Sequence, residues 1–185
     1  MALPTLVVVS GPAGTGKTTL AHELARAIGC PAICRDEIKE GMVHAAGEIE
    51  FVPEAGDSLT VRTLPVFFDV VATLVRAGVT VVAEAAFQDK VWAPNLEPFS
   101  DLAHLCVVQC YTDADVARQR VEQRASSRTA HADAMVLDDD QYFDNFVRFG
   151  SGIPSIGVDT TNGYEPELEA VVDFINGRAS RRATP

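Results

Sequence analysis

Eight consecutive residues near the N-terminus have the types and spacing needed to hold the phosphates of a nucleotide. The run from Gly11 to Thr18 fits the pattern G-x-x-x-x-G-K-[ST] at every required position. Its glycines let the backbone turn tightly and aim N–H groups at phosphate oxygens. Lys17 would place its ammonium on the β- and γ-phosphates, and the Thr18 hydroxyl would take one coordination position on Mg²⁺. The expected nucleotide-binding residues of this loop are Gly11, Ala13, Gly14, Thr15, Gly16, Lys17, Thr18 and Thr19.

The motif indicates a phosphate loop only when a buried strand precedes it and a helix follows it. Residues 6–9 form a β-branched apolar run typical of a central parallel strand, and this strand should end at Ser10. From Lys17 onward, apolar residues recur at helical spacing as far as Ile28, and Gly29 is a natural stop. The sequence therefore predicts strand, phosphate loop and helix in succession.

An acidic residue, Asp36, lies just after the next predicted strand. Residues 30–34 read as a short strand, and Arg35, Asp36 and Glu37 follow it, with Asp36 at the start of a predicted helix over 36–44. In open α/β sheets ligands bind outside the carboxyl ends of the strands, so Asp36 can reach the same crevice as the phosphate loop. Alternatively it only caps the helix that follows.

Glu84 occupies an equivalent place after a third buried strand, predicted over 79–83. A carboxylate there can hold Mg²⁺-bound water or face the phosphate acceptor. The alternative is that Glu84 only caps a loop at the end of the strand. We favour the functional role. The helix before this strand is predicted from Val61 to a stop at Gly78, and Pro65 should either start its regular part or kink it.

Two arginines one helical turn apart follow a fourth predicted strand over 102–111. Thr112 or Asp113 caps the helix that carries them. Arg120 and Arg124 could reach over the phosphates and stabilise the charge of phosphoryl transfer. Alternatively, both arginines are only solvated or paired with a neighbouring acidic residue, as is usual on a charged helix face.

The remaining segments complete one domain. Residues 45–57 read as a loop bordering the substrate, where Phe51 would line a pocket, and residues 126–152 read as a small lid. A fifth strand is predicted over 155–159, followed by a helix with apolar positions from Leu168 to Ile175. We expect a single domain over 1–177 and a flexible tail over 178–185.

Composition limits the function classes. At 185 residues with 47% hydrophobic content, the chain suits one α/β domain. No apolar run approaches the roughly 20 residues of a membrane span and no basic leader precedes the first strand, so we expect a cytoplasmic protein. The net charge of −11 disfavours a long track for a nucleic-acid backbone.

Cysteine and histidine spacing predicts no additional metal site. Two cysteine pairs are each spaced i, i+4, which is not the C-x-x-C spacing of a zinc ribbon, and buried reduced thiols are expected. The histidines form no ligand pair of the H-x-x-x-H kind. Metal is therefore expected only at Thr18 and Glu84. The residues concerned are Cys30, Cys34, Cys106, Cys110, His22, His44, His104 and His131.

On the phosphate loop, Arg35-Asp36, Glu84 and the Arg120/Arg124 pair, the chain resembles the small P-loop kinases, in particular the polynucleotide kinase and chloramphenicol phosphotransferase group of AAA_33-type ATP-binding proteins. The resemblance implies an α/β fold: a three-layer α/β/α sandwich with five parallel strands, the phosphate-loop strand in the middle, and a small lid.

The resemblance also implies roles for single residues. Asp36 matches the aspartate that accepts the proton of the substrate hydroxyl, and Glu84 matches an acidic position that is commonly aspartate. Arg120 and Arg124 match a pair that contacts ATP phosphates, and Thr160 lies in the segment near the adenine. Lys39 stands where polynucleotide kinases carry a substrate-binding arginine. This departure weakens the case for a 5′-terminal nucleotide, because lysine lacks the bidentate fork.

The predicted function is an ATP-dependent kinase that phosphorylates a hydroxyl of a small molecule such as an antibiotic, sugar or nucleoside. Lys17, Mg²⁺ and Arg124 would neutralise the transferred phosphate while Asp36 deprotonates the hydroxyl. A nucleic-acid 5′-hydroxyl kinase is an alternative that the net charge and Lys39 disfavour. A nucleotide-dependent switch or assembly ATPase is a further alternative, disfavoured because the chain has neither an N-K-x-D guanine motif nor room for a helical lid domain.

Overall fold

A five-stranded sheet forms the centre of the protein. The computed structural model describes residues 2–45, 58–125, 146–147 and 152–177. All strands pair in parallel, in the order β2-β3-β1-β4-β5, so the strand that enters the phosphate loop is central as predicted. The strands are β1 (Thr5–Ser10), β2 (Ala32–Cys34), β3 (Val81–Glu84), β4 (His104–Tyr111) and β5 (Ser155–Asp159).

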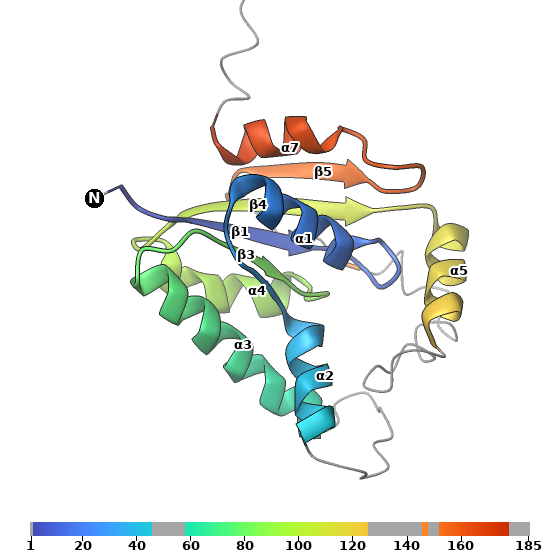
Figure 1. The fold of residues 1–185 in the computed structure, drawn as a ribbon, viewed down its shortest axis with the longest axis horizontal. Coiled ribbons are helices and arrows are strands. Elements are labelled where there is room, and N and C mark those ends of the chain that lie inside the picture. Colours follow the sequence, from blue (N-terminus) through green and yellow to red (C-terminus); the bar gives the residue numbers. More distant parts are fainter. Residues whose placement is uncertain (1, 46–57, 126–145, 148–151, 178–185) are drawn as a thin grey trace, which may run out of the picture.

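Helices cover both faces of this sheet, which gives the predicted three-layer α/β/α architecture (Figure 1). Helices α1 and α7 lie on one face and α3 and α4 on the other, while α5 stands at the carboxyl end of the strands. The described helices are α1 (Lys17–Ile28), α2 (Arg35–Ala45), α3 (Ser58–Arg76), α4 (Asp89–Leu96), α5 (Ala114–Ala125) and α7 (Leu168–Ile175), with a short 3₁₀ turn η1 (Glu97–Phe99).

Strand β1 is apolar on both faces because it is covered on both. Leu6 and Val8 pack with α3 and α4, whereas Val7 and Val9 pack with α1 and α7. All four are fully buried. A central parallel strand has no solvent face, so its sequence loses the polar alternation of an antiparallel strand.

Several predicted boundaries agree with the structure and others need correction. Helix α1 and strand β5 have the predicted limits, and Gly29 ends α1 in the left-handed conformation at φ 80°. Strands β2, β3 and β4 each begin two residues later than predicted, at Ala32, Val81 and His104. The substrate loop was predicted to begin at residue 45, which is instead the last residue of α2. Residues 46–57, most of the predicted lid and the tail lie outside the described residues.

Helix α3 differs most from its prediction. It begins at Ser58, so Pro65 lies inside the helix rather than at its start. Ser58 and Thr60 are polar, and Leu59 is followed three and four positions later by Arg62 and Thr63, so no apolar period marks the first turn and the sequence pattern placed the start later. By length and composition α3 resembles a membrane span, with a mean hydropathy of 1.5. Its Phe67, Phe68 and Val71 are buried against the sheet, as in the core helix of a globular protein.

Four aromatic rings join α3 to the segment after β3. Phe67 and Phe68 contact each other edge to face with their ring centroids 5.1 Å apart, and both pack on Phe87 and Trp92. Trp92 also donates a hydrogen bond from Nε1 to Ser10 Oγ at 3.1 Å, and Ser10 Oγ donates to the Phe87 carbonyl at 3.0 Å. The last residue of β1 is therefore tied to the aromatic cluster.

We expect Phe67→Ala to lower the free energy of unfolding by about 3–5 kcal/mol, because it removes a fully buried ring and leaves a cavity. Val61→Ala on the same helix serves as the control, since Val61 is 63% exposed, and its effect should stay within about 0.5 kcal/mol. Urea unfolding of the two variants measures both values. Equal destabilisation would contradict the assignment of Phe67 to the core.

Candidate active site

The phosphate loop connects β1 to α1 and follows a course that only glycine allows at two positions. Gly14 has φ +80°, and a Cβ there would lie 2.4 Å from the Ala117 carbonyl oxygen. A Cβ on Gly11 would lie 2.4 Å from the carbonyl oxygen of Cys110. Both distances are far below van der Waals contact. The loop therefore packs directly against the end of β4 and the first turns of α5.

The loop is also fixed by its own side chains. Thr15 Oγ1 donates to the Pro12 carbonyl at 2.8 Å, and Lys17 Nζ donates to the same carbonyl at 3.4 Å. Lys17 is 6% exposed, so its ammonium lies over the loop, in the region where phosphates would bind. Thr19 is exposed at the rim.

Glu84 reaches the phosphate loop from β3. It pairs in register with Val9 of β1, and its Oε2 accepts a hydrogen bond from Thr18 Oγ1 at 3.1 Å. The other oxygen, Oε1, is buried without a hydrogen-bond partner, since Lys17 Nζ at 3.9 Å is too distant to donate one. The two residues predicted to hold metal therefore lie together.

Burial raises the pKa of the Glu84 carboxyl, and the nearby Asp36 carboxylate raises it further. The Lys17 ammonium and the Thr18 hydrogen bond oppose this shift. Glu84 is 1% exposed, so desolvation is the largest cause. A cation at this point would favour the ionised form of Glu84.

Asp36 lies in the first turn of α2, one residue inside the helix. Helix α2 begins at Arg35, so Asp36 is its second residue rather than the residue before it. Arg35 Nη1 donates to Asp36 Oδ1 at 2.9 Å, and the Asp36 side chain remains 22% exposed. The Asp36 carboxylate is close enough to Glu84 to raise the pKa of that carboxyl. Asp36, Glu84 and the phosphate loop therefore converge at the carboxyl ends of β2, β3 and β1.

Lys39 was predicted to contact the substrate, and in the structure it is buried between α2 and α3. Its side chain is 3% exposed, and Nζ donates to Thr60 Oγ1 on α3 at 2.8 Å. Arg35 Nη2 also donates to the Thr60 carbonyl at 3.4 Å. Two cations of α2 therefore bind one residue of α3. The predicted partner in the substrate pocket, Phe51, lies outside the described residues.

Arg120 joins α5 to the phosphate loop and to the turn after β5. Its Nη2 donates to the Thr160 carbonyl at 2.7 Å, and its Nη1 donates to the Gly14 carbonyl at 3.5 Å. Thr160 Oγ1 in turn donates to the Thr15 carbonyl at 2.9 Å. Arg120 therefore ties α5 to the phosphate loop and to the turn after β5.

Arg124 lies one turn further along α5, where its Nε donates to the Arg120 carbonyl at 3.1 Å. It borders a cavity of about 410 Å³ beside the phosphate loop. The sequence predicted Arg120, Arg124 and Thr160 for the nucleotide, and all three line this cavity. Gln123 and Tyr164 line it as well and were missed, because neither belongs to a motif.

The cysteines agree with the prediction of buried reduced thiols. Cys34, Cys106 and Cys110 are buried and Cys30 is half-buried, and all four are free. Burial raises the pKa of Cys106 and of Cys110 to about 12, so these two thiols stay protonated.

Comparison with known proteins agrees with this geometry. A family model described as an AAA domain, AAA_33, matches residues 6–144. The chain belongs to this family. The match covers the phosphate loop, Asp36, Glu84 and both arginines of α5. No curated protein sequence matches the chain.

Solved structures with the same fold include several kinases. A candidate kinase of Chloroflexus aurantiacus has a TM-score of 0.78 at 20% identity, over 96% of this chain and 99% of that chain. A sugar kinase of Janibacter has a TM-score of 0.66 at 17% identity, over 96% and 97%. The APS kinase of Mycobacterium tuberculosis, solved with AMPPNP and APS, has a TM-score of 0.67 at 14% identity, over 95% and 99%. This AAA domain protein thus has the fold of small P-loop kinases, and the resemblance drawn from its sequence is confirmed.

Gly14→Ala should reduce nucleotide affinity sharply, because the new Cβ must displace the Ala117 backbone in addition to adopting a left-handed conformation. Gly78→Ala is a matched control, since Gly78 has φ +79° and open space around its Cβ position. The control should cost only the conformational strain of about 1–2 kcal/mol in unfolding free energy and leave binding unchanged. Calorimetric titration with ATP and urea unfolding separate the two effects.

Arg120→Ala should lower the free energy of unfolding by about 2–3 kcal/mol, because it leaves buried carbonyl oxygens of the Thr160 turn and the phosphate loop without a charged donor. Arg76→Ala, at the exposed end of α3, should change it by no more than about 0.5 kcal/mol. Thermal and urea unfolding measure both. A neutral Arg120→Ala would show that the arginine does not hold the loop.

Proposed function

We propose that this protein is an ATP-dependent kinase that moves the γ-phosphate of MgATP to a hydroxyl of a small molecule. The observation that carries the proposal is the convergence of Lys17, the Thr18–Glu84 pair and Asp36 at the carboxyl ends of three adjacent strands. These are the groups that phosphoryl transfer needs: an ammonium, ligands for a metal and a carboxylate base.

The residues present fit a magnesium ion. Thr18 offers a hydroxyl and Glu84 offers Oε1, a buried oxygen without a hydrogen-bond partner. Hard oxygen donors suit Mg²⁺, which commonly retains several waters and binds through one or two protein groups. When bound, the ion would neutralise charge on the β- and γ-phosphates. Glu84 would hold one of its waters, and Thr18 would bind it directly.

Asp36 is proposed as the base that orients and deprotonates the acceptor hydroxyl. Arg35 fixes one of its oxygens at 2.9 Å, and its partial exposure leaves the carboxylate open to an incoming substrate. The protein needs no covalent intermediate, because alignment of the hydroxyl with the γ-phosphate supplies much of the rate enhancement. Lys17 and Arg124 would stabilise the charge on the transferred group.

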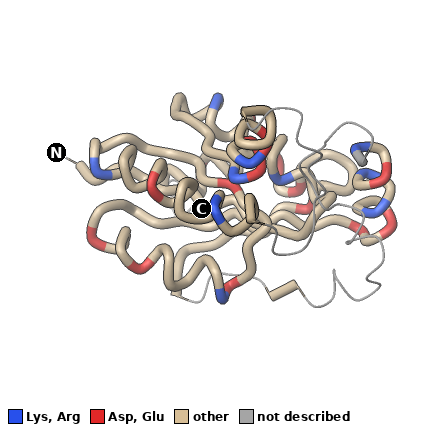
Figure 2. The backbone as a smooth tube through the Cα atoms, turned by 90° about the horizontal axis from the view of Figure 1, so that it is seen from below, with Lys and Arg blue, Asp and Glu red and all other residues tan. Residues whose placement is uncertain are grey.

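A small-molecule acceptor is favoured over a nucleic acid by the charge of the surface. Lysine and arginine positions are interspersed with aspartate and glutamate along the described backbone (Figure 2). A backbone-binding track relies on clustered cations that release counterions, and the chain carries a net charge of −11. Lys39, the residue at the expected substrate-phosphate position, is buried on Thr60.

Asp36→Asn should retain ATP binding and lose phosphate transfer by about two orders of magnitude or more, because asparagine cannot accept the hydroxyl proton. The control is Asp69→Asn, an exposed carboxylate of α3, which should transfer at the wild-type rate. The assay follows labelled γ-phosphate from MgATP into pools of aminoglycosides, phenicols, sugars, nucleosides and 5′-hydroxyl oligonucleotides.

Each result of this assay has a distinct meaning. Label in one small-molecule pool, absent with Asp36→Asn, supports the proposal and gives the substrate class. Label confined to oligonucleotides would replace the proposed acceptor with a nucleic-acid 5′-hydroxyl. ATP binding without transfer to any pool would contradict the kinase proposal and favour a nucleotide-dependent switch.

A further inference from the structure

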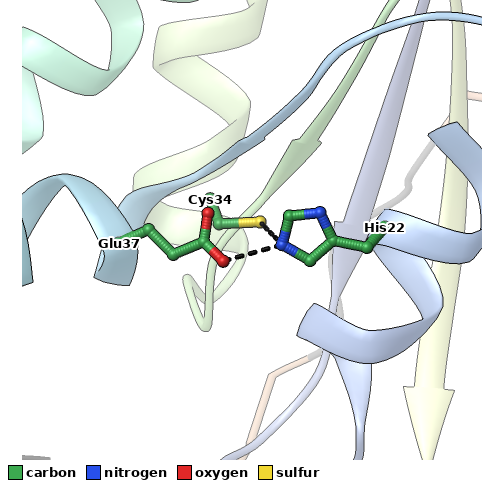
Figure 3. Close-up of side chains that lie close together, drawn as sticks. All are labelled: His22, Cys34 and Glu37. Atoms are coloured by element: carbon green, nitrogen blue, oxygen red, sulfur yellow. Dashed lines mark hydrogen bonds and ion pairs between the residues drawn. The ribbon is translucent and has the colours of Figure 1, made fainter. Parts of the chain in front are cut away.

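A histidine, a cysteine and a glutamate meet beside the phosphate loop without any part in the proposed transfer reaction (Figure 3). They come from three successive elements. His22 lies one turn beyond Thr18 on α1, Cys34 ends β2, and Glu37 lies in the first turn of α2. Among the described residues, these are the three metal-ligating side chains whose donor atoms all lie within 4.8 Å of one another.

The three donor atoms converge on one point. Nε2 of His22 lies 2.7 Å from Oε1 of Glu37 and 3.7 Å from Sγ of Cys34. Zinc binds sulfur at about 2.3 Å and nitrogen or oxygen at about 2.0–2.2 Å, so two donors on one tetrahedral ion lie about 3–4 Å apart. The sulfur–nitrogen separation already falls in this range. The carboxylate needs only to move back from its hydrogen bond with the imidazole.

The surroundings favour a cation between these groups. Cys34 is 2% exposed, whereas the side chains of His22 and Glu37 are 43% and 53% exposed, so the point of convergence is reached from solvent. The carboxylates of Glu84, Glu37 and Asp36 lie close enough to Cys34 to interact with its thiol, and these negative groups would attract a divalent ion.

The geometry points to a binding site for a zinc-class divalent ion formed by Cys34 Sγ, His22 Nε2 and Glu37 Oε1. A thiolate, an imidazole and a carboxylate together select zinc-like ions over Mg²⁺ or Ca²⁺, which prefer oxygen alone. Binding forms bonds from the metal to sulfur, nitrogen and oxygen. The Cys34 proton is released to solvent, and the imidazole carries its remaining proton on Nδ1.

Three protein donors leave one position of a tetrahedral ion open. His22 and Glu37 border a cavity of about 520 Å³ that also reaches Thr18, Thr19 and Arg124. Water or an anionic group in this cavity would complete the coordination. The ion would join α1, β2 and α2, and it would therefore restrain the helix that carries Asp36 relative to the phosphate loop. The binding site does not depend on the proposed kinase activity.

The test is zinc binding to the full chain, measured by competition with a chromophoric chelator in excess Mg²⁺ so that the nucleotide metal site is saturated. Wild type should bind one Zn²⁺ per chain, and His22→Gln, Glu37→Gln and Cys34→Ser should each weaken binding by about tenfold or more. Cys30→Ser is the matched control, because Cys30 lies four residues away and outside the triad. Its affinity should equal that of wild type.

Cobalt gives a second readout that reports the ligand itself. Co²⁺ bound to wild type should show a thiolate charge-transfer absorption that is absent from Cys34→Ser and present in Cys30→Ser. Because His22 and Glu37 are partly exposed, their variants keep the test valid if Cys34→Ser fails to fold. Absence of one-to-one binding, or unchanged binding in both His22→Gln and Glu37→Gln, would overturn the proposal.

Discussion

The parallel pairing of β1 with both β3 and β4 is the constraint on which the site depends. This pairing sets Val9 beside Glu84 and Ser10 beside Gln109. The phosphate loop therefore leaves the sheet between β3, which ends at Glu84, and β4, which continues to Tyr111. Since β2 pairs in parallel with β3, Cys34 lies beside Glu84 and the start of α2 reaches the same edge. One register therefore brings together residues that lie far apart in the sequence, such as Lys17 and Glu84, which are 67 positions apart.

The most accurate predictions concern elements that follow one another closely in the sequence. The phosphate loop, its strand and its helix follow one another within 30 residues, so motif and periodicity were sufficient to locate them. Glu84 and Asp36 were predicted as site residues because each lies at or just after the end of a strand, and the parallel fold brings strand ends together. The start of α3 was misplaced because Leu59, the one apolar residue of its first three, has no apolar residue three or four positions later.

Contacts between side chains of different elements could not be predicted in this way. Lys39 was predicted to bind the substrate because it stands where polynucleotide kinases carry a substrate-binding arginine. Its ammonium is buried and donates to Thr60 of the next helix. His22, Cys34 and Glu37 have no metal-binding spacing along the chain, and only the folding of α1 against β2 and α2 brings them together. Arg120 was assigned to phosphates, although its hydrogen bonds to Gly14 and Thr160 require the turn after β5 to be in place.

The link between Trp92 and Ser10 has a practical consequence. Trp92 is the single tryptophan of the chain, it is fully buried, and its indole N–H binds the residue directly before Gly11. A displacement of the phosphate loop would alter that hydrogen bond and the packing of the indole on Phe87. The protein therefore carries an intrinsic fluorophore at the base of its phosphate loop, and a displacement of that loop would change the emission of the unlabelled chain.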